Sequence, residues 1–146
     1  MNGRSLLFAR NNHMIEWDDK YSIGISIIDE QHKKLFGIIN RTIYAKENSN
    51  DIEELKEVLE EMTEYALEHF ETEEAYMTMF NYPEYEYHNE EHYGFITKTN
   101  EYFDRVVNGD YHISNELLEY LKQWLVSHIQ ITDRKYVDCF KKNGLK

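Results

Sequence analysis

The chain has 146 residues and a mass of 17.7 kDa, a length typical of one domain that folds around a single core without disulfides. Its 28 acidic and 16 basic residues give a formal net charge of −12, which disfavours nucleic acid and anionic membranes as partners. Cys139 is the only cysteine, and the apolar run 5–9 is too short for a signal peptide or a membrane-spanning helix. We therefore expect a cytoplasmic protein.

The first thirteen residues carry no amphipathic period and end in His13-Met14, a dipeptide that a common cloning site places before a native start. We therefore expect residues 1–13 to be a vector-derived or disordered leader and residues 14–146 to form the folded domain. The segment 17–26 predicts an extended N-terminal arm that lies over this domain, with Trp17 as its anchor.

Apolar residues recur at helical spacing in two segments that follow the arm. The first predicted helix runs from about residue 28 to 45 and carries His32 within its apolar stripe. The second follows the polar turn 47–49, continues to about residue 80 and has His69 and Glu73 in its stripe. A carboxylate in a core stripe is costly to bury unless a cation compensates its charge, and this favours a metal.

Two further helices are predicted. The third follows the turn 81–83, presents His88 and His92 on its inner face and stops at 108–110. The fourth begins near Ser114, carries His128 and Asp133, and continues as a short helical extension toward residue 140. No strand pattern is present and the connections are short. The sequence therefore predicts an all-α, up-down-up-down antiparallel four-helix bundle with an N-terminal arm and a C-terminal helical extension.

This topology predicts that the polar residues of the stripes meet in one layer. The start of an odd-numbered helix and the end of an even-numbered helix lie at the same end of such a bundle. The candidate metal ligands all occupy such positions, and they are His32, His69, Glu73, His88, His92, His128 and Asp133. A lone histidine on an apolar face is most often an ordinary core residue, but five histidines and two carboxylates in one layer indicate a metal site.

The ligand types narrow the choice of metal. Imidazole and carboxylate without thiolate suit iron, zinc, copper or nickel, and seven ligands exceed the four of a structural zinc site. Two metal ions are therefore expected. Carboxylate-rich di-iron bundles use two Glu-x-x-His pairs, and no histidine here has a glutamate three residues before it. The pattern predicts a histidine-rich dinuclear centre instead.

The spacing of His128 and Asp133 predicts a distorted helix. Residues five apart point about 140° away from each other around a regular α-helix, too far to reach one metal centre. The pairs His69/Glu73 and His88/His92 are four apart and need no such adjustment. We therefore predict a π-type widening, or a break, between His128 and Asp133, to which the Thr132 hydroxyl could contribute by bonding a carbonyl one turn back.

Four runs resemble motifs of the hemerythrin family, in particular of its single-domain bacterial members: residues 28–33, 69–74, 88–92 and 124–133. The resemblance covers about residues 17–140. It implies two non-haem iron ions per chain, bridged by carboxylates and an oxo or hydroxo group, that bind O2 reversibly. His88, His92 and His128 would hold one iron, His32 and His69 the other, and Glu73 and Asp133 would bridge them. The open iron position could also take small anions or NO.

Six side chains surround these ligands in the sequence, and we expect them to form an apolar O2 pocket besides packing the core. They are Leu35, Phe70, Trp124, Leu125, Ile129 and Tyr136. Glu71 and Glu74 are expected on the solvated side of the second helix, without a role at the centre. The largely polar outer faces of the helices suggest a monomer.

Other functions remain open at this stage. His88 to His92 also match the inverted zinc-protease motif with Glu91 as general base, but that reading leaves five ligands unexplained and offers no room for a substrate cleft. The same dinuclear site could instead serve an O2 or redox sensor, or a di-iron oxidase or nitric oxide handler. A sensor is disfavoured because no signalling domain is attached, and an oxidase because the pocket lacks a general acid. We therefore expect an oxygen carrier rather than an enzyme.

Overall fold

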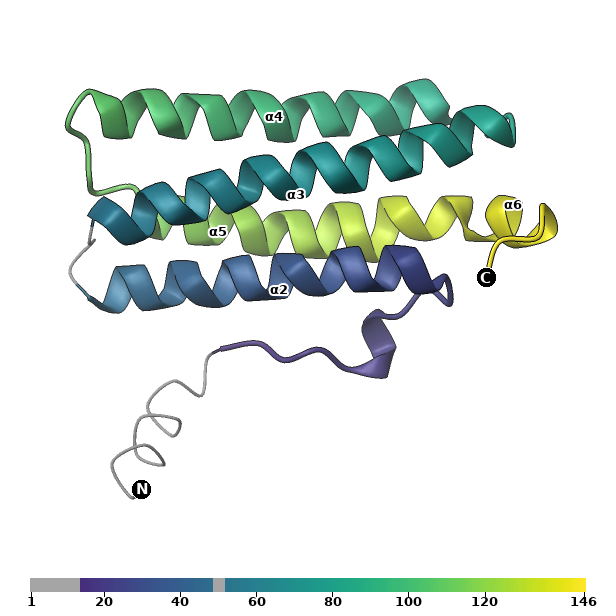
Figure 1. Cartoon of the computed structure of the whole chain (residues 1–146), viewed down its shortest axis with the longest axis horizontal. Helices are drawn as coiled ribbons and strands as arrows, with labels where there is room; N and C mark the ends of the chain where they lie inside the picture. Colours follow the sequence, from purple (N-terminus) through teal and green to yellow (C-terminus); the bar gives the residue numbers. More distant parts are fainter. Residues whose placement is uncertain (1–13, 49–51) are drawn as a thin grey trace, which may run out of the picture.

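The computed structural model describes residues 14–48 and 52–146, and its long helices form an antiparallel bundle (Figure 1). These helices are α2 (Ser26–Glu47), α3 (Ile52–Met79), α4 (Tyr85–Val107) and α5 (Ser114–Trp124). The α5 helix continues through η2 (Leu125–Thr132) and η3 (Asp133–Tyr136) into the short helix α6 (Val137–Lys142). α2 packs against α3 and α5, and α3 packs against α4. The predicted all-α up-down-up-down bundle with its C-terminal extension is confirmed.

The predicted leader 1–13 and part of the turn after α2 lie outside the described residues. Within the described part of the chain there is no strand, and no helix there has both the length and the apolar composition needed to cross a bilayer.

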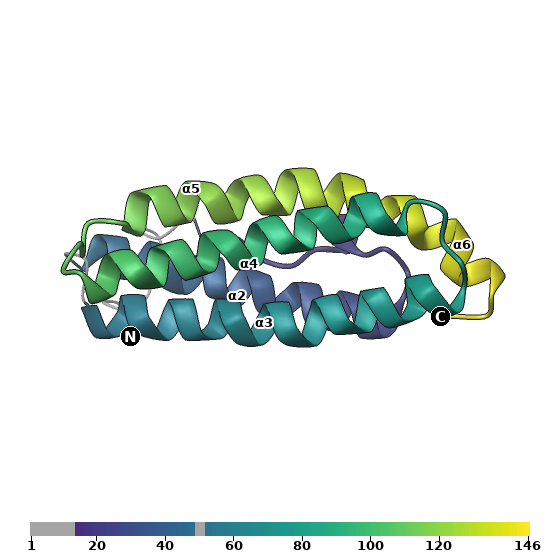
Figure 2. The ribbon, with the colours of Figure 1, turned by 90° about the horizontal axis from the view of Figure 1, so that it is seen from above.

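The apolar core is divided into two clusters by a layer of buried polar residues. In α2, Ile28 belongs to the smaller cluster and Leu35 to the larger one, with His32 between them. In α3, Glu73 lies in the same way between Phe70 and Met77. The smaller cluster closes the end of the bundle near α6, and it contains Ile23, Ile25, Ile28, Met77, Tyr82, Tyr136 and Phe140. The polar layer is therefore covered by apolar side chains on both sides along the bundle axis. Figure 2 shows α6 at one end of the bundle, opposite the end where α5 begins.

The N-terminal arm runs along α2, as predicted, and contains one short 3-10 turn, η1 (Asp19–Tyr21) (Figure 1). The Trp17 ring packs on Phe36 with 5.3 Å between ring centroids, so Trp17 does anchor the arm. Asn40 holds the arm by two hydrogen bonds, because its side-chain oxygen accepts from the Ile15 N–H at 2.9 Å and its amide donates to the Ile15 carbonyl at 2.8 Å. The arm thus packs on α2 as an addition to the four long helices of the bundle.

Candidate metal centre

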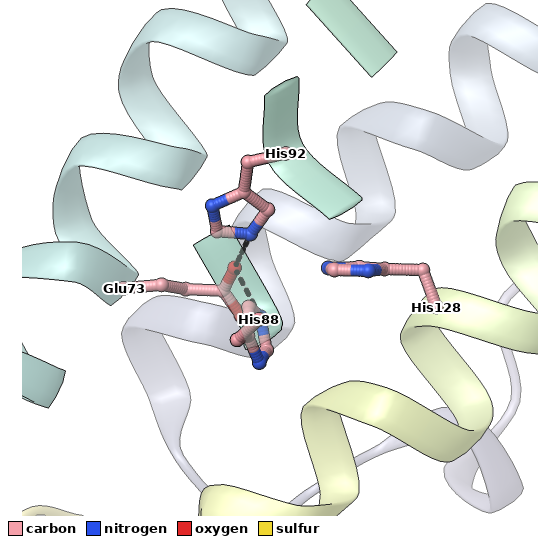
Figure 3. A group of neighbouring side chains, drawn as sticks. All are labelled: Glu73, His88, His92 and His128. Atoms are coloured by element: carbon pink, nitrogen blue, oxygen red, sulfur yellow. Dashed lines mark hydrogen bonds and ion pairs between the residues drawn. The ribbon is translucent and has the colours of Figure 1, made fainter. Parts of the chain in front are cut away.

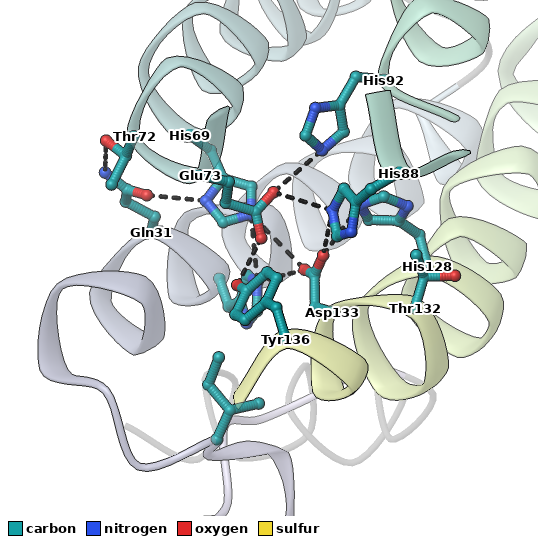
Figure 4. A network of polar contacts seen from close by, with 12 residues as sticks. Gln31, His69, Thr72, Glu73, His88, His92, His128, Thr132, Asp133 and Tyr136 are labelled. Carbon is teal, nitrogen blue, oxygen red and sulfur yellow. Dashed lines mark hydrogen bonds and ion pairs between the residues drawn. The ribbon is translucent and has the colours of Figure 1, made fainter. Parts of the chain in front are cut away.

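The structure brings all seven predicted ligand residues together in one buried layer. Figure 4 labels all of them except His32. None of their side chains exceeds 1% exposure. Their ligand atoms form two groups that share Glu73. One group is Glu73, His88, His92 and His128 (Figure 3), and the other is His32, His69, Glu73 and Asp133.

The two carboxylates lie between the two groups of histidines. Asp133 Oδ1 is 3.0 Å from the Nε2 atoms of both His88 and His128, whereas its Oδ2 is 2.9 Å from His32 Nε2. Glu73 Oε1 is 3.0 Å from His92 Nε2 and 3.3 Å from His69 Nε2. Each carboxylate therefore faces histidines of both groups, which is the arrangement that a bridging ligand requires.

Several buried polar atoms in this layer have no hydrogen-bond partner. They include Nε2 of His88, Nε2 of His128 and Oδ1 of Asp133, although this oxygen lies only 3.0 Å from each of the two nitrogens. His32 and His69 turn their Nε2 atoms toward each other at 3.2 Å. Unsatisfied buried groups are rare because each costs free energy, so such a cluster calls for a cation. The donor set fits two metal ions bound by imidazole and carboxylate.

Three polar residues outside the predicted set hold the outer nitrogen of a histidine. Nδ1 of His92 lies 2.9 Å from Glu74 Oε2, and Nδ1 of His128 lies 2.7 Å from Glu91 Oε1. Nδ1 of His69 lies 2.7 Å from Gln31 Oε1. The expectation that Glu74 has no role at the centre is therefore wrong, while Glu71 is exposed as expected. Glu74 and Glu91 are partly exposed, and Gln31 lies next to His32 in the sequence. None of the three interrupts the apolar repeat, so the sequence pattern does not predict their contacts with the histidines.

The position of Glu91 also bears on the zinc-protease reading. Its carboxylate hydrogen-bonds the outer edge of the His128 ring and lies within 3.2 Å of the Thr132 hydroxyl. A general base must face the position of the reacting water, and this carboxylate faces the back of a histidine instead.

All six residues of the predicted O2 pocket are buried, and the aromatic ones contact the histidines directly. Phe70 stacks on His92 with ring centroids 3.8 Å apart, and Trp124 stacks on His128 at 3.9 Å. Leu35, Leu125 and Ile129 belong to the larger apolar cluster. Tyr65 was not predicted, yet it stacks on His69 at 5.2 Å and accepts a hydrogen bond from Trp124 Nε1.

Tyr136 differs from its predicted role as an apolar wall. Its hydroxyl donates a hydrogen bond to Glu73 Oε2 at 2.5 Å, and its ring stacks on Phe140 of α6 with 4.1 Å between centroids. Burial raises the pKa of Tyr136 well above its usual value, and the nearby Glu73 and Asp133 charges add to this. The hydroxyl therefore keeps its proton and acts as a fixed donor to Glu73.

The predicted distortion between His128 and Asp133 is confirmed. Residues Leu125–Thr132 form a π-helix, and the Asp133 N–H donates to the His128 carbonyl five residues back rather than to the one four residues back. The Thr132 hydroxyl lies 3.2 Å from the Ser127 carbonyl, one wide turn back, as well as near Glu91. The wider turn brings the His128 and Asp133 side chains to the same side of the helix.

The buried carboxylates and histidines stabilise each other's charged forms. Burial opposes ionisation of Glu73 and Asp133, but the surrounding histidines outweigh it and hold both pKa values well below their usual range. Burial also lowers the pKa of His88 and His128, but the Asp133 and Glu73 carboxylates outweigh it and raise these pKa values to about 10 and about 9. Without metal, two imidazolium charges thus balance two carboxylates.

Metal binding is therefore expected to release protons. Because His88 and His128 are protonated at pH 7 in the metal-free protein and must be neutral to bind a metal, loading at pH 7 should release about two protons per chain. Metal affinity should rise with pH until it passes the raised pKa values of these histidines, and fall as pH drops. Titrating metal-free protein with Zn²⁺ in weakly buffered indicator solution measures the release. Loading without proton release would contradict this charge assignment.

Comparison with known proteins agrees with the geometry of the layer. A family model described as "Hemerythrin HHE cation binding domain" matches residues 23–140. A bacteriohemerythrin of Stenotrophomonas maltophilia is 34% identical over 128 residues, which cover 88% of this chain and 82% of that protein. One from Clostridium acetobutylicum is 31% identical over 129 residues, covering 86% and 100%.

The fold agrees as well. A crystal structure of a hemerythrin mutant, 21% identical in sequence, superimposes with a TM-score of 0.79 and covers 87% of this chain and 97% of that one. The family model spans more than half of the chain, and the bacterial relatives exceed 30% identity over most of their length. The chain therefore belongs to the hemerythrin family.

Proposed function

We propose that this protein binds O2 reversibly at a centre of two non-haem iron ions and serves as an oxygen carrier or store. One observation supports this most directly, namely two groups of buried histidines that face the same two carboxylates. When bound, two irons would supply the electrons that O2 accepts on binding and returns on release. The chain's membership of the hemerythrin family supports the same proposal.

In this proposal, each residue of the layer has a distinct task. His88, His92 and His128 would hold one iron through Nε2, and His32 and His69 would hold the other. Glu73 and Asp133 would be shared by the two ions and would neutralise part of their charge in this buried site. With two histidines against three, the position at His32 and His69 is the one left open for O2, for NO or for a small anion.

Exclusion of water makes the reaction reversible, because proton delivery would convert bound O2 into released peroxide. Phe70 and Trp124 lie flat against two of the histidines and are 3% and 6% exposed, so their rings cover the centre from the larger apolar cluster. Tyr136 and Phe140 cover it from the other end.

The test is the visible spectrum of iron-loaded, reduced protein before O2, after O2 and after removal of O2. Colour that appears with O2 and disappears with its removal is the expected result. Colour that persists while O2 is consumed would overturn the proposal.

A second candidate, a di-iron oxidase or nitric oxide handler, is favoured by one observation. The sequence suggested a pocket without a proton donor, but the Tyr136 hydroxyl is fully buried and bonded to Glu73. Its raised pKa argues that it retains its proton, which suits the carrier better.

Tyr136→Phe separates the two candidates. The variant should lose about 1.5–3 kcal/mol of unfolding free energy, because it removes a hydrogen bond to a buried carboxylate. If the protein is a carrier, the spectrum of Tyr136→Phe should still change reversibly with O2. Loss of an O2-consuming activity that the unmodified protein possesses would instead assign the hydroxyl to oxidase chemistry. Denaturant unfolding and O2-electrode measurements give the two readouts.

A further inference from the structure

The acceptors behind the histidines differ in charge between the two groups. His92 and His128, which belong to the group of three histidines, face the carboxylates of Glu74 and Glu91 at 2.9 and 2.7 Å. His69, which belongs to the group of two, faces the side-chain amide of Gln31 at 2.7 Å. The Nδ1 atoms of His32 and His88 have no hydrogen-bond partner in the described structure.

The orientation of the Gln31 amide follows from its other neighbour. The Thr72 hydroxyl donates its single hydrogen to the Glu68 carbonyl at 2.9 Å, so its oxygen can only accept from Gln31. The Gln31 NH2 group therefore points to Thr72 at 3.0 Å, and its carbonyl oxygen points to His69 (Figure 4). His69 must carry its hydrogen on Nδ1, which leaves the lone pair of Nε2 directed into the centre.

The same reasoning applies to the two carboxylates. An ionised carboxylate only accepts hydrogen bonds, so the rings of His92 and His128 also carry hydrogen on Nδ1. With metal bound, both rings would be neutral and would turn an Nε2 lone pair inward. Thr132, whose hydroxyl is 3.1 Å from Glu91 Oε1, restrains this carboxylate beside His128. All three acceptors set the same ring tautomer, but only two of them carry charge.

We propose that Glu74 and Glu91 make the three-histidine position electron-rich, whereas the neutral Gln31 leaves the two-histidine position electron-poor. This inference rests on the proposed di-iron centre. A carboxylate that accepts the outer N–H of a metal-bound imidazole gives the ring anionic character and raises its basicity. Such charge stabilises a ferric ion more than a ferrous one, so it lowers the reduction potential. The position proposed for O2 lacks this charge, so an iron ion held there would have the higher reduction potential and would recover its electron more readily when O2 leaves.

The swaps Glu74→Gln and Glu91→Gln test the proposal, because each removes the charge and keeps an acceptor of the same shape. Both should raise the midpoint potential of the iron-loaded protein, measured by mediated spectroelectrochemistry, and lower iron affinity roughly tenfold. Glu71→Gln, on the exposed side of α3, is the matched control and should leave both quantities unchanged. Gln31→Leu removes a neutral acceptor and should shift the potential less than Glu91→Gln does.

The proposal would be overturned if the midpoint potentials of Glu74→Gln and Glu91→Gln equalled that of Glu71→Gln. It would also be overturned if Gln31→Leu shifted the midpoint potential as much as Glu91→Gln does. NMR of the diamagnetic zinc-loaded protein adds a readout independent of iron and O2. The Nδ1–H protons of His92 and His128 should resonate downfield and move upfield in the respective Gln variants, and unchanged resonances would count against the carboxylate contacts. If iron and potentials behave as expected but O2 binding is irreversible, only the proposed carrier function fails. If the unmodified protein holds no iron pair, both fail.

Discussion

Glu73→Ala and Asp133→Ala are each expected to lower the iron content by at least one ion per chain. Each substitution removes a carboxylate that faces histidines of both groups, and so would leave two cations under-neutralised in a buried site. Breaking a buried charge pair by removing one partner is strongly destabilising, by roughly 3–5 kcal/mol. Iron analysis of the purified variants, normalised to protein concentration, measures the effect.

Glu71→Ala is the proper control for this experiment. Its side chain is exposed on the same helix, and the variant should retain full iron content. Glu74→Ala would be a poor control, because Glu74 accepts a hydrogen bond from His92. Two irons per chain in both Glu73→Ala and Asp133→Ala would contradict the bridging assignment.

Trp124→Ala is expected to speed autoxidation of the O2-bound protein several-fold while leaving most of the iron in place. The indole stacks on His128 and is not a ligand, so its removal opens a cavity through which water reaches the centre. The cavity should also cost about 3–5 kcal/mol of unfolding free energy. The decay of the O2-dependent absorption band, followed by stopped flow or in a cuvette, measures autoxidation.

Tyr102→Ala controls for the loss of a large buried aromatic side chain. Tyr102 is 2% exposed and lies ten residues along α4 from His92, about 15 Å along the helix axis. This variant should be destabilised to a similar degree without faster autoxidation. If both variants autoxidise alike, or neither does, Trp124 packs the core and does nothing more.

The helical stripes and the inner faces of the centre could be predicted from the sequence because burial imposes a strict period. His32, His69 and His88 occupy positions of the helical repeat where an apolar residue is expected, and this exception can be recognised in the sequence alone. The distortion at His128 could be predicted for the same reason, since a spacing of five violates the period. Its extent could not, because the π-helix covers all of Leu125–Thr132 rather than a single widened step.

What the sequence could not show is which polar residues of one helix meet the next. Glu74 and Glu91 lie beside the stripes, where a carboxylate is ordinary, and only the relative rotation of α3, α4 and η2 brings them to the histidines. Tyr136 was assigned by its ring alone. The partner of its hydroxyl depends on how α6 packs at the end of the bundle. The Tyr136 ring stacks on Phe140 of α6, and its hydroxyl reaches the Glu73 carboxylate.

The distance along the chain between the first and last residues of the centre has a consequence for folding. His32 and Asp133 are 101 residues apart, yet their side chains lie within 2.9 Å. A metal bound between them closes a loop through the whole bundle, and closing such a loop in a flexible chain costs entropy on the order of 4 kcal/mol. The complete centre would therefore form only after the helices have docked, and a metal held by all of its ligands would resist their separation. In a chain with a single cysteine, the metal-loaded centre would serve as the cross-link that no internal disulfide can provide.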